Sequence, residues 1–308
     1  STVLCKTMAM EHDLFNFNSH SPHRFHDGQT RMTSGSGSGG GDGGGGGFGS
    51  GTSDSHLSAL RCWRRVKSHG DLPGPRSGAA SVVVGNKLYM FGGYGGNGRL
   101  DDFYEFDLDS KKWSQVQYVG ASPGVRENNG VVEHKGRLYL FGGYNGSQWL
   151  NDFHEFDPIT RVWRIVEPKG NPPASRFGYV SVVHGSRFIL FGGYDGTAWL
   201  NDTHEYDFDT ELWKSVETKG QIPSIRSCPS WCKEGNKVFV FGGYDGVRRM
   251  NDFFCCDLDT DTWHQLPCGG APQDIPSPRY FHACTMYSGK MYTFGGFNGS
   301  ERLNDSKT

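Results

Sequence analysis

The stretch FGGYDGTAWLNDTHEYDFDTELW, from Phe191 to Trp213, contains the motif that decides the fold, because the chain repeats it. FGGY or FGGF begins at five positions, with three steps of 50 residues and a last step of 53: Phe91, Phe141, Phe191, Phe241 and Phe294. A tryptophan closes the same stretch four times, at Trp113, Trp163, Trp213 and Trp263. Similarity at a fixed period of this length indicates a tandem array of one structural unit. The stretch is therefore a repeated unit and not a single active-site loop.

Each copy contains four short segments rich in β-branched and aromatic residues. In the third copy they read SRFGYVSVVH, RFILFGG, THEYD and ELWKSV. Short segments of this composition, separated by Gly, Asp and Asn, favour strands, and no longer stretch shows the 3.6-residue period of a helix. Four strands in about 50 residues make one blade of a β-propeller. We therefore expect an all-β propeller of four-stranded blades.

The conspicuous residues of the motif have structural roles in such a blade. A glycine pair at the end of a strand allows close backbone approach and dihedral angles that a Cβ would forbid. The tryptophan of the fourth strand is large enough to wedge between neighbouring sheets. Aspartates in the turn before it, as in DFDTELW, bond their own backbone and fix the hairpin. The recurring carboxylates are therefore turn residues.

Paired glycines, a tyrosine-containing strand, an Asn-Asp loop and a tryptophan about twenty residues later resemble kelch repeats. The resemblance covers residues 60–305 in five copies. With PPxxR before the first strand and LND before the third, the repeats look most like the kelch half of the leucine-zipper-like transcriptional regulator. That resemblance implies a non-catalytic protein-interaction module that recruits substrates for a cullin-type ubiquitin-ligase adaptor, with an acidic peptide or a small Ras-like GTPase as partner. A trafficking or cytoskeletal scaffold is the alternative within the same fold.

The chain divides at a glycine-rich tract. We expect residues 1–59, which include GSGSGGGDGGGGGFGSG, to be a disordered arm, and residues 60–308 to be the kelch-type propeller. The segment LRCWRRV around Trp63 matches a fourth strand and is expected to complete the last blade. Four repeats are complete, whereas the partial fifth stops at Thr308 after two strands. We expect the natural chain to continue, to six or seven blades.

Composition narrows the classes of partner. Lys+Arg 31 against Asp+Glu 33 gives a net charge of −2, which does not favour nucleic acid. No apolar run is long enough to insert in a membrane, and no signal-peptide core occurs near the N-terminus. The irregularly spaced cysteines are expected to be reduced thiols, which predicts a cytoplasmic protein. No cofactor is expected.

The loop between the second and third strands holds the first set of candidate binding residues. Six residues after each glycine pair the sequence has arginine or tryptophan: Arg99, Trp149, Trp199, Arg249 and Arg302. Both residue types are enriched at interface hot spots, so this ring is expected to face a partner. The neighbouring candidates are Tyr144, Asn145, Asp195, Asp245 and Arg248. The alternative is that the two tryptophans fold back onto their own blades.

A second ring consists of the arginine before each first strand: Arg76, Arg126, Arg176, Arg226 and Arg279. In kelch proteins that bind peptides, the matching positions line the mouth of the central channel, and guanidinium groups suit a carboxylate. The alternative is that these arginines bond loop carbonyls.

An enzyme is the third reading. The resemblance extends to galactose-oxidase-like copper enzymes, which need histidine and tyrosine ligands around one metal. Here His134 and His184 are one repeat apart, as are His154 and His204, so they belong to different blades. Cys228 and Cys232 have no second cysteine pair for zinc. We therefore predict no catalytic residue and no metal site.

Overall fold

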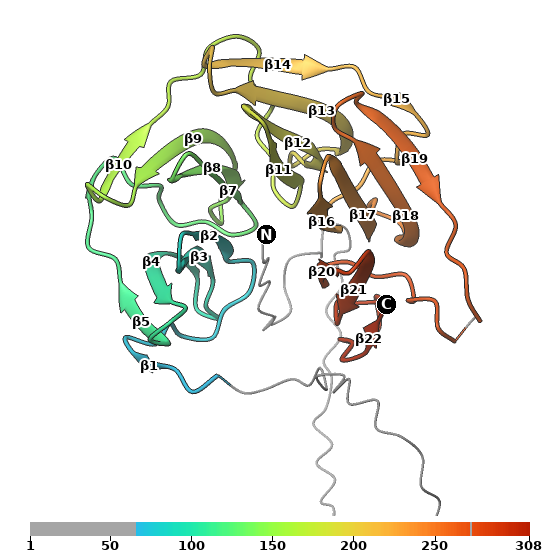
Figure 1. The fold of residues 1–308 in the computed structure, drawn as a ribbon, viewed down its shortest axis with the longest axis horizontal. Helices are drawn as coiled ribbons and strands as arrows, with labels where there is room; N and C mark the ends of the chain where they lie inside the picture. Colours follow the sequence, from blue (N-terminus) through green and yellow to red (C-terminus); the bar gives the residue numbers. More distant parts are fainter. Residues whose placement is uncertain (1–65, 272) are drawn as a thin grey trace, which may run out of the picture. The chain divides into compact units, whose positions relative to one another are not determined.

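The computed structural model describes residues 66–271 and 273–308, and every regular element in these ranges is a β-strand (Figure 1). Residues 67–308 belong to one compact unit. The arm at residues 1–59 lies outside the described residues, as does almost all of LRCWRRV, so both expectations stay predictions.

Five sheets follow one another along the chain, each built from the strands of one repeat. The first strands lie nearest the centre of Figure 1: β2 (Ala80–Val84), β7 (Gly130–His134), β11 (Val180–His184), β16 (Ser230–Glu234) and β20 (Ala283–Tyr287). The second strands carry the glycine pair or run up to it: β3 (Lys87–Tyr94), β8 (Arg137–Tyr144), β12 (Arg187–Tyr194), β17 (Lys237–Tyr244) and β21 (Lys290–Phe294). The third strands are β4 (Arg99–Asp107), β9 (Trp149–Asp157), β13 (Trp199–Asp207), β18 (Arg249–Asp257) and β22 (Ser306–Lys307). The fourth strands are β5 (Lys112–Gln115), β10 (Val162–Ile165), β14 (Leu212–Val216) and β19 (Thr262–Leu266).

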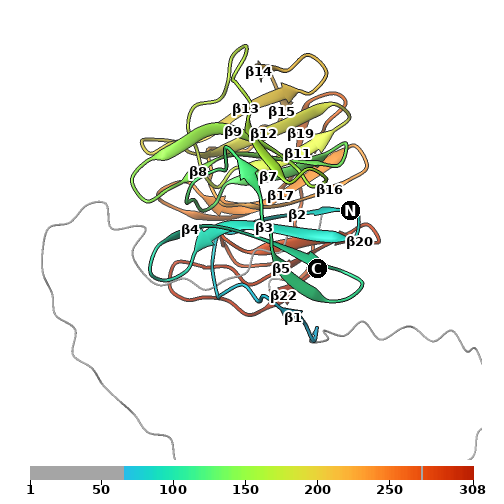
Figure 2. The ribbon, with the colours of Figure 1, turned by 90° about the vertical axis from the view of Figure 1, so that its left-hand side faces the viewer.

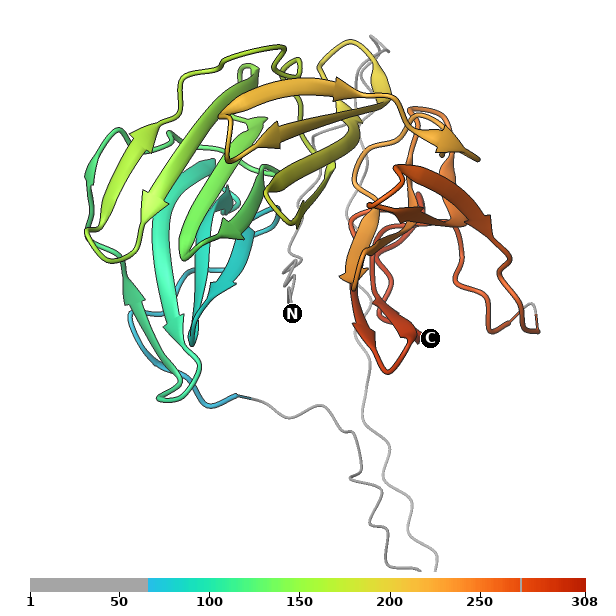
Figure 3. The same ribbon diagram turned by 45° about the horizontal axis from the view of Figure 1, so that its top comes forward.

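Successive sheets, numbered 1 to 5 here, contact one another through their first strands. The tilted view in Figure 3 follows this order by colour, from the blue strands of sheet 1 to the red strands of sheet 5. The strands of a sheet are joined by loops at their two ends, as the side view shows (Figure 2). The structure is thus a propeller of five sheets, which confirms the all-β fold.

Sheet 5 differs from the expectation of two strands. Its order is β20–β21–β22, because Ser306 and Lys307 pair antiparallel with Phe294 and Thr293. The two-residue β22 pairs with its second strand at the same position as the third strands of the other sheets do.

The glycine pair shifts the register between the second and third strands. In sheet 3, Phe191 faces Thr203 but Gly193 faces Leu200, and Gly193 has a φ of 103°. A Cβ on Gly193 would lie 2.9 Å from the carbonyl oxygen of Phe177. A side chain is therefore excluded both by the backbone conformation and by the loop packed against it.

The hydrophobic core lies between neighbouring sheets. Trp213 is 2% exposed, and its ring centroid lies 5.3 Å from that of Phe141 in the preceding sheet. Trp163 and Trp263 pack in the same way against Phe91 and Phe191. The expected wedging of the fourth-strand tryptophans between sheets is confirmed for these three.

A short segment covers the outer edge of the fourth strand, which the sequence did not predict. Parallel strands β1 (His69–Gly70), β6 (Val119–Gly120) and β15 (Lys219–Gly220) pair with β5, β10 and β19. Covering an edge strand removes a site for unwanted pairing. The glycine permits this approach, because Gly120 has a φ of 92° and a Cβ there would lie 2.2 Å from the carbonyl oxygen of Trp163.

Replacing Gly120 with alanine is therefore expected to destabilise the protein by roughly 2–3 kcal/mol, through steric overlap and a forced positive φ. The measurement is the midpoint of urea unfolding. Gly124→Ala is the matched control, since a Cβ at Gly124 has no atom within 4 Å. Equal midpoints for the two variants would show that the edge-covering strand contributes nothing.

Candidate functional site

The five arginines of the predicted channel mouth are buried, with 0–4% of their surface exposed. Arg226 is typical. Its Nη1 and Nη2 donate to the two carboxylate oxygens of Asp252 at 2.7 and 2.9 Å, and Nη1 also donates to the carbonyl of Gly242 at 3.0 Å. Nε donates to the carbonyl of Ser224. The other four arginines bond in the same way to Asp102, Asp152, Asp202 and Asp305.

The backbone of the same arginine bonds the preceding sheet. The Arg226 amide donates to the carbonyl of Leu200 at 3.0 Å, and its carbonyl accepts from Gly193 at 2.8 Å. Its side chain is therefore hydrogen-bonded to sheet 4, whereas its main chain is hydrogen-bonded to sheet 3. We call this arrangement the arginine bridge. The side chain does bond a loop carbonyl, as the alternative expected, but its main partner is the carboxylate of Asp252, and the Gly242 carbonyl belongs to strand β17. A role of these arginines at a channel mouth stays a prediction.

In three of the bridges, those of Asp152, Asp202 and Asp305, the pKa of the carboxylate is lowered. Burial alone would raise the pKa of Asp202, but hydrogen bonds from Arg176 and His204 bring it well below its ordinary value. Asp152 has the same arrangement with Arg126 and His154. Because the pKa is lowered in the folded state, these ion pairs stabilise the fold at any pH above the ordinary carboxyl pKa. That stabilisation is lost only as the pH falls through the lower folded-state pKa.

The loop arginines and tryptophans link neighbouring sheets on the end of the propeller where the second strands finish. The Trp149 ring lies 4.7 Å from Tyr144 of its own sheet and 5.5 Å from Tyr194 of the next. Trp199 lies 4.4 Å from Tyr194 and 5.7 Å from Tyr244. Each ring therefore packs on its own sheet, as the alternative expected, and also reaches the next sheet. That these residues face a partner stays a prediction.

Arginines take the place of tryptophan at the two outer positions of this row. The Arg99 guanidinium lies about 5 Å from the ring centres of Tyr94 and Tyr144, within cation–π range. Arg249 lies 4.8 Å from the ring centre of Tyr244. We call Arg99, Trp149, Trp199 and Arg249 the bridging residues. Together with the tyrosines that they contact, they form what we call the aromatic row.

Arg99 and Trp199 also bond the residue that directly follows the bridge arginine of the next repeat. Arg99 donates to Glu127 at 2.8 Å, and Trp199 Nε1 donates to the Ser227 hydroxyl at 3.2 Å. Glu127 is 2% exposed; burial raises its pKa, and the Arg99 cation opposes that rise without cancelling it. The partner residue thus differs from boundary to boundary.

The remaining predicted loop residues divide into two groups. Asn145, Asp195 and Asp245 use a side-chain oxygen to accept backbone amides two and three residues later, so they shape their own loops. The Tyr144 hydroxyl likewise donates to the carbonyl of Gly146. Arg248, with 77% of its side chain exposed, and Arg302 project into solvent.

The sequence did not predict the exposed apolar side chains at the same end of the propeller. Val247 is 80% exposed, and Val125, Ile222 and Ile225 are also exposed. Val125 and Ile225 directly precede bridge arginines, where other repeats have proline or serine. Val or Ile in place of proline or serine was the available signal in the sequence, and it was overlooked.

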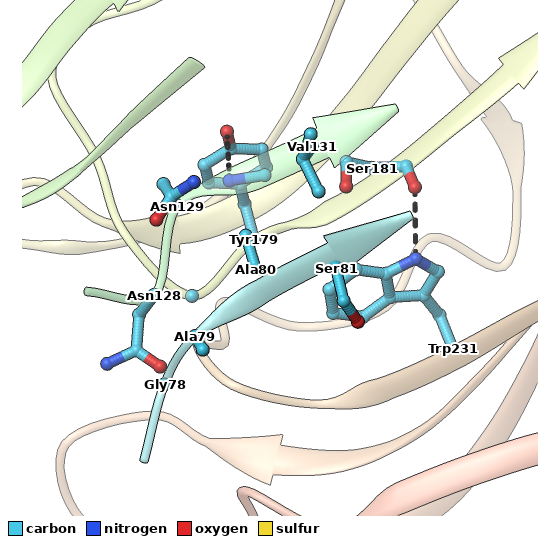
Figure 4. Close-up of a pocket in the computed structure, with 12 residues that line it drawn as sticks. Gly78, Ala79, Ala80, Ser81, Asn128, Asn129, Val131, Tyr179, Ser181 and Trp231 are labelled. Atoms are coloured by element: carbon cyan, nitrogen blue, oxygen red, sulfur yellow. Dashed lines mark hydrogen bonds between the residues drawn. The ribbon is translucent and has the colours of Figure 1, made fainter. Parts of the chain in front are cut away.

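The axis between the first strands holds a cavity of about 30 Å³, lined by residues such as Ser81, Asn129 and Ser181 (Figure 4). The Tyr179 hydroxyl accepts from Gly130 and donates to Phe141, and Trp231 Nε1 donates to Ser181. A volume of this size accommodates about one water molecule. A partner is therefore expected to bind on the loops and not along the axis.

Histidines do not gather in the described part of the chain. His154 and His204 orient bridge carboxylates, His184 pairs with Asp259, and His134 stacks on Phe208. No group of three or more His, Cys, Asp or Glu residues in residues 66–271 and 273–308 is placed to hold a metal ion. No helix among these residues is long and apolar enough to cross a membrane.

Changing Asp252 to Asn is expected to destabilise the fold by roughly 3 kcal/mol, since it leaves the buried Arg226 cation without a counter-charge. Thermal or urea unfolding measures the loss. The control is Asp209→Asn, which removes a carboxylate from an exposed pair with Lys135 and is expected to change stability little. Similar losses in the two variants would contradict a structural role for the bridge.

Comparison with known proteins places this geometry in a family. Kelch domain-containing protein 2 of Homo sapiens is 38% identical over 48 residues, which are 16% of this chain and 12% of that protein; the protein of the same name from Rattus norvegicus gives the same values. Rho GTPase-activating protein gacHH of Dictyostelium discoideum is 57% identical over 30 residues, 10% of this chain and 2% of that protein. The matched segments thus span a small part of these relatives.

Residues 40–233 and 228–308 match the family described as the KLHDC2/KLHL20/DRC7 Kelch-repeats domain. The match covers most of the chain and all five sheets, and it agrees with the repeats and with the propeller that they form. The chain therefore belongs to the KLHDC2/KLHL20/DRC7 kelch-repeat family.

Proposed function

We propose that the end of the propeller bearing the aromatic row is a non-catalytic binding surface for a protein partner. We call it the loop face; it consists of the loops between second and third strands and the segments before the bridge arginines. The observation that carries the proposal is the aromatic row itself, which crosses four sheet boundaries beside exposed apolar side chains.

Rigid aromatic side chains suit binding because little conformational entropy is lost when a partner covers them. Trp149 and Trp199 are held between two tyrosines each, so their partly exposed edges are fixed before binding. The exposed side chains of Val247 and Ile225 add apolar surface to the loop face. Aromatic anchors with apolar and arginine neighbours are the usual composition of an interface hot spot.

The charge of the loop face favours an acidic partner segment. The bridge arginines are occupied by aspartates, so recognition of carboxylates falls to the solvent-facing Arg248 and Arg302 and to the outer edge of Arg249. Arginine pairs with carboxylates through two parallel hydrogen bonds. An acidic peptide or an acidic patch on a small Ras-like GTPase fits this chemistry, and the name of the Dictyostelium relative is in keeping with a GTPase.

The biological role that we propose is substrate recruitment for a cullin-type ubiquitin-ligase adaptor. It is supported by the likeness of the PPxxR and LND motifs to the kelch half of the leucine-zipper-like transcriptional regulator. A cytoplasmic location follows from that role. A trafficking or cytoskeletal scaffold would use the same surface, and the two roles differ in what happens to the bound partner.

Partner capture by the full chain is expected to fall at least tenfold in the variant Val247→Asp with Arg248→Glu, because both changes oppose burial against an acidic segment. Proximity labelling followed by binding of the purified partner provides the measurement. Trp199→Ala is expected to weaken binding too, with some loss of stability because it leaves a gap between sheets 3 and 4.

The matched control is Ile159→Asp, at an exposed apolar residue in the turn at the opposite end of sheet 2. It is expected to bind like the parent protein. If the opposite-end variant loses the partner and the loop-face variant keeps it, the proposed surface is wrong.

A ubiquitin-ligase role predicts that a captured partner is turned over in a cullin-dependent way. Blocking cullin neddylation in cells with the parent protein should raise the partner's abundance, whereas cells with the Val247→Asp, Arg248→Glu variant should show no further rise. Stable partner levels in both cells, together with intact binding, would favour the scaffold role.

A further inference from the structure

The boundary between sheets 4 and 5 contains two buried cysteines on neighbouring first strands. Strands β16 and β20 lie side by side near the axis (Figure 1), although they belong to different sheets and share no backbone ladder among the described strands. Cys232 lies on β16 and Cys284 on β20, and the Cys284 thiol raises the pKa of the Cys232 thiol. Both residues are buried, and no disulfide joins them.

A lateral contact fixes how the two strands face each other. The Ser230 hydroxyl lies 2.5 Å from His282 Nε2. Ser230 stands two residues before Cys232, and His282 stands two residues before Cys284. Ser230 and Cys232 share a face of β16, because residues two apart on a strand do so, and His282 stands directly before β20. The Ser230 contact with His282 therefore turns the face of β16 that carries Cys232 toward the sheet that carries Cys284.

We propose that Cys232 and Cys284 are an oxidisable dithiol that forms a disulfide between sheets 4 and 5 on reaction with a small-molecule disulfide such as oxidised glutathione. One thiolate attacks the glutathione disulfide, which forms a mixed disulfide and releases one glutathione. The second thiolate then displaces the remaining glutathione. The two cysteine sulfurs lose two electrons and two protons, and one oxidised glutathione becomes two reduced molecules.

Geometry selects this pair among the described cysteines. Cys255 and Cys256 are consecutive on β18, so their side chains point to opposite faces of the sheet. Cys268 is exposed, follows β19 in the chain, and donates its thiol to the carbonyl of Asn251 on β18. Among the described cysteines, Cys232 and Cys284 are the two that neighbouring first strands, β16 and β20, carry at one sheet boundary.

Burial makes the reaction slow and dependent on pH. The Cys284 thiol and desolvation raise the pKa of the Cys232 thiol. The reactive thiolate is therefore scarce at neutral pH, and the rate is expected to rise as the pH increases. Glutathione also needs local opening of the boundary to reach the sulfurs. Once formed, the bond closes a long loop of the unfolded chain and so stabilises the fold.

The test uses the full wild-type chain, first reduced and then incubated with excess oxidised glutathione at mildly alkaline pH. The sample is quenched in acid, the remaining thiols are alkylated, and peptides are mapped without reduction. The expected product is a peptide pair linked through Cys232 and Cys284, which a dithiol reductant separates. The urea midpoint of the oxidised protein should lie above that of the reduced protein.

Cys232→Ser is the matched variant and is expected to give no linked pair and no shift in the urea midpoint on oxidation. The wild-type map decides the question even if this variant folds poorly. The proposal is overturned if Cys268 alone takes up glutathione while Cys232 and Cys284 stay free. A disulfide from either cysteine to another residue would overturn it as well.

Discussion

The structure depends on a buried arginine at each sheet boundary whose main chain and side chain bond different sheets. Arg226 uses its amide and carbonyl to hold Leu200 and Gly193 of sheet 3, and its guanidinium to hold Asp252 and Gly242 of sheet 4. A buried cation is costly unless its donors are satisfied. Here a bidentate carboxylate and two carbonyls satisfy them, so the arginine fixes the relative position of two sheets that share no strand ladder.

That constraint explains why the loop face is ordered. The arginine bridge fixes the loop that precedes each first strand against the start of the preceding third strand, where the aromatic row begins. Trp199 is consequently held against Tyr194 of its own sheet and against Ser227 and Tyr244 of the next. Loop residues are normally mobile, whereas these occupy fixed positions because the sheets on both sides are fixed.

The sequence predicted the features that depend on a single repeat, and it missed the polar contacts that join neighbouring repeats. Strand types, the glycine pair and the wedging of Trp213 follow from one repeat alone, because they depend on local dihedral angles and on apolar size. The arginine bridge had a signal that was overlooked, since an aspartate follows each bridge arginine by the same 26 residues, as in Arg226 and Asp252. The contact of Arg99 with Glu127 depends on how neighbouring sheets pack, which a single repeat does not specify.

Differences between otherwise equivalent sheet boundaries distinguish the residues that hold the fold together from the residues that are available to a partner. Identical bridges occur at every boundary, so their loss would damage the fold before it revealed a partner. Trp199 was among the residues that the sequence predicted to face a partner, yet its ring also fills a sheet boundary, so truncating it confounds binding with stability. Val247 and Arg248 extend from the same face without filling that boundary. We propose that substitutions at these two residues separate binding at the loop face from the stability of the fold.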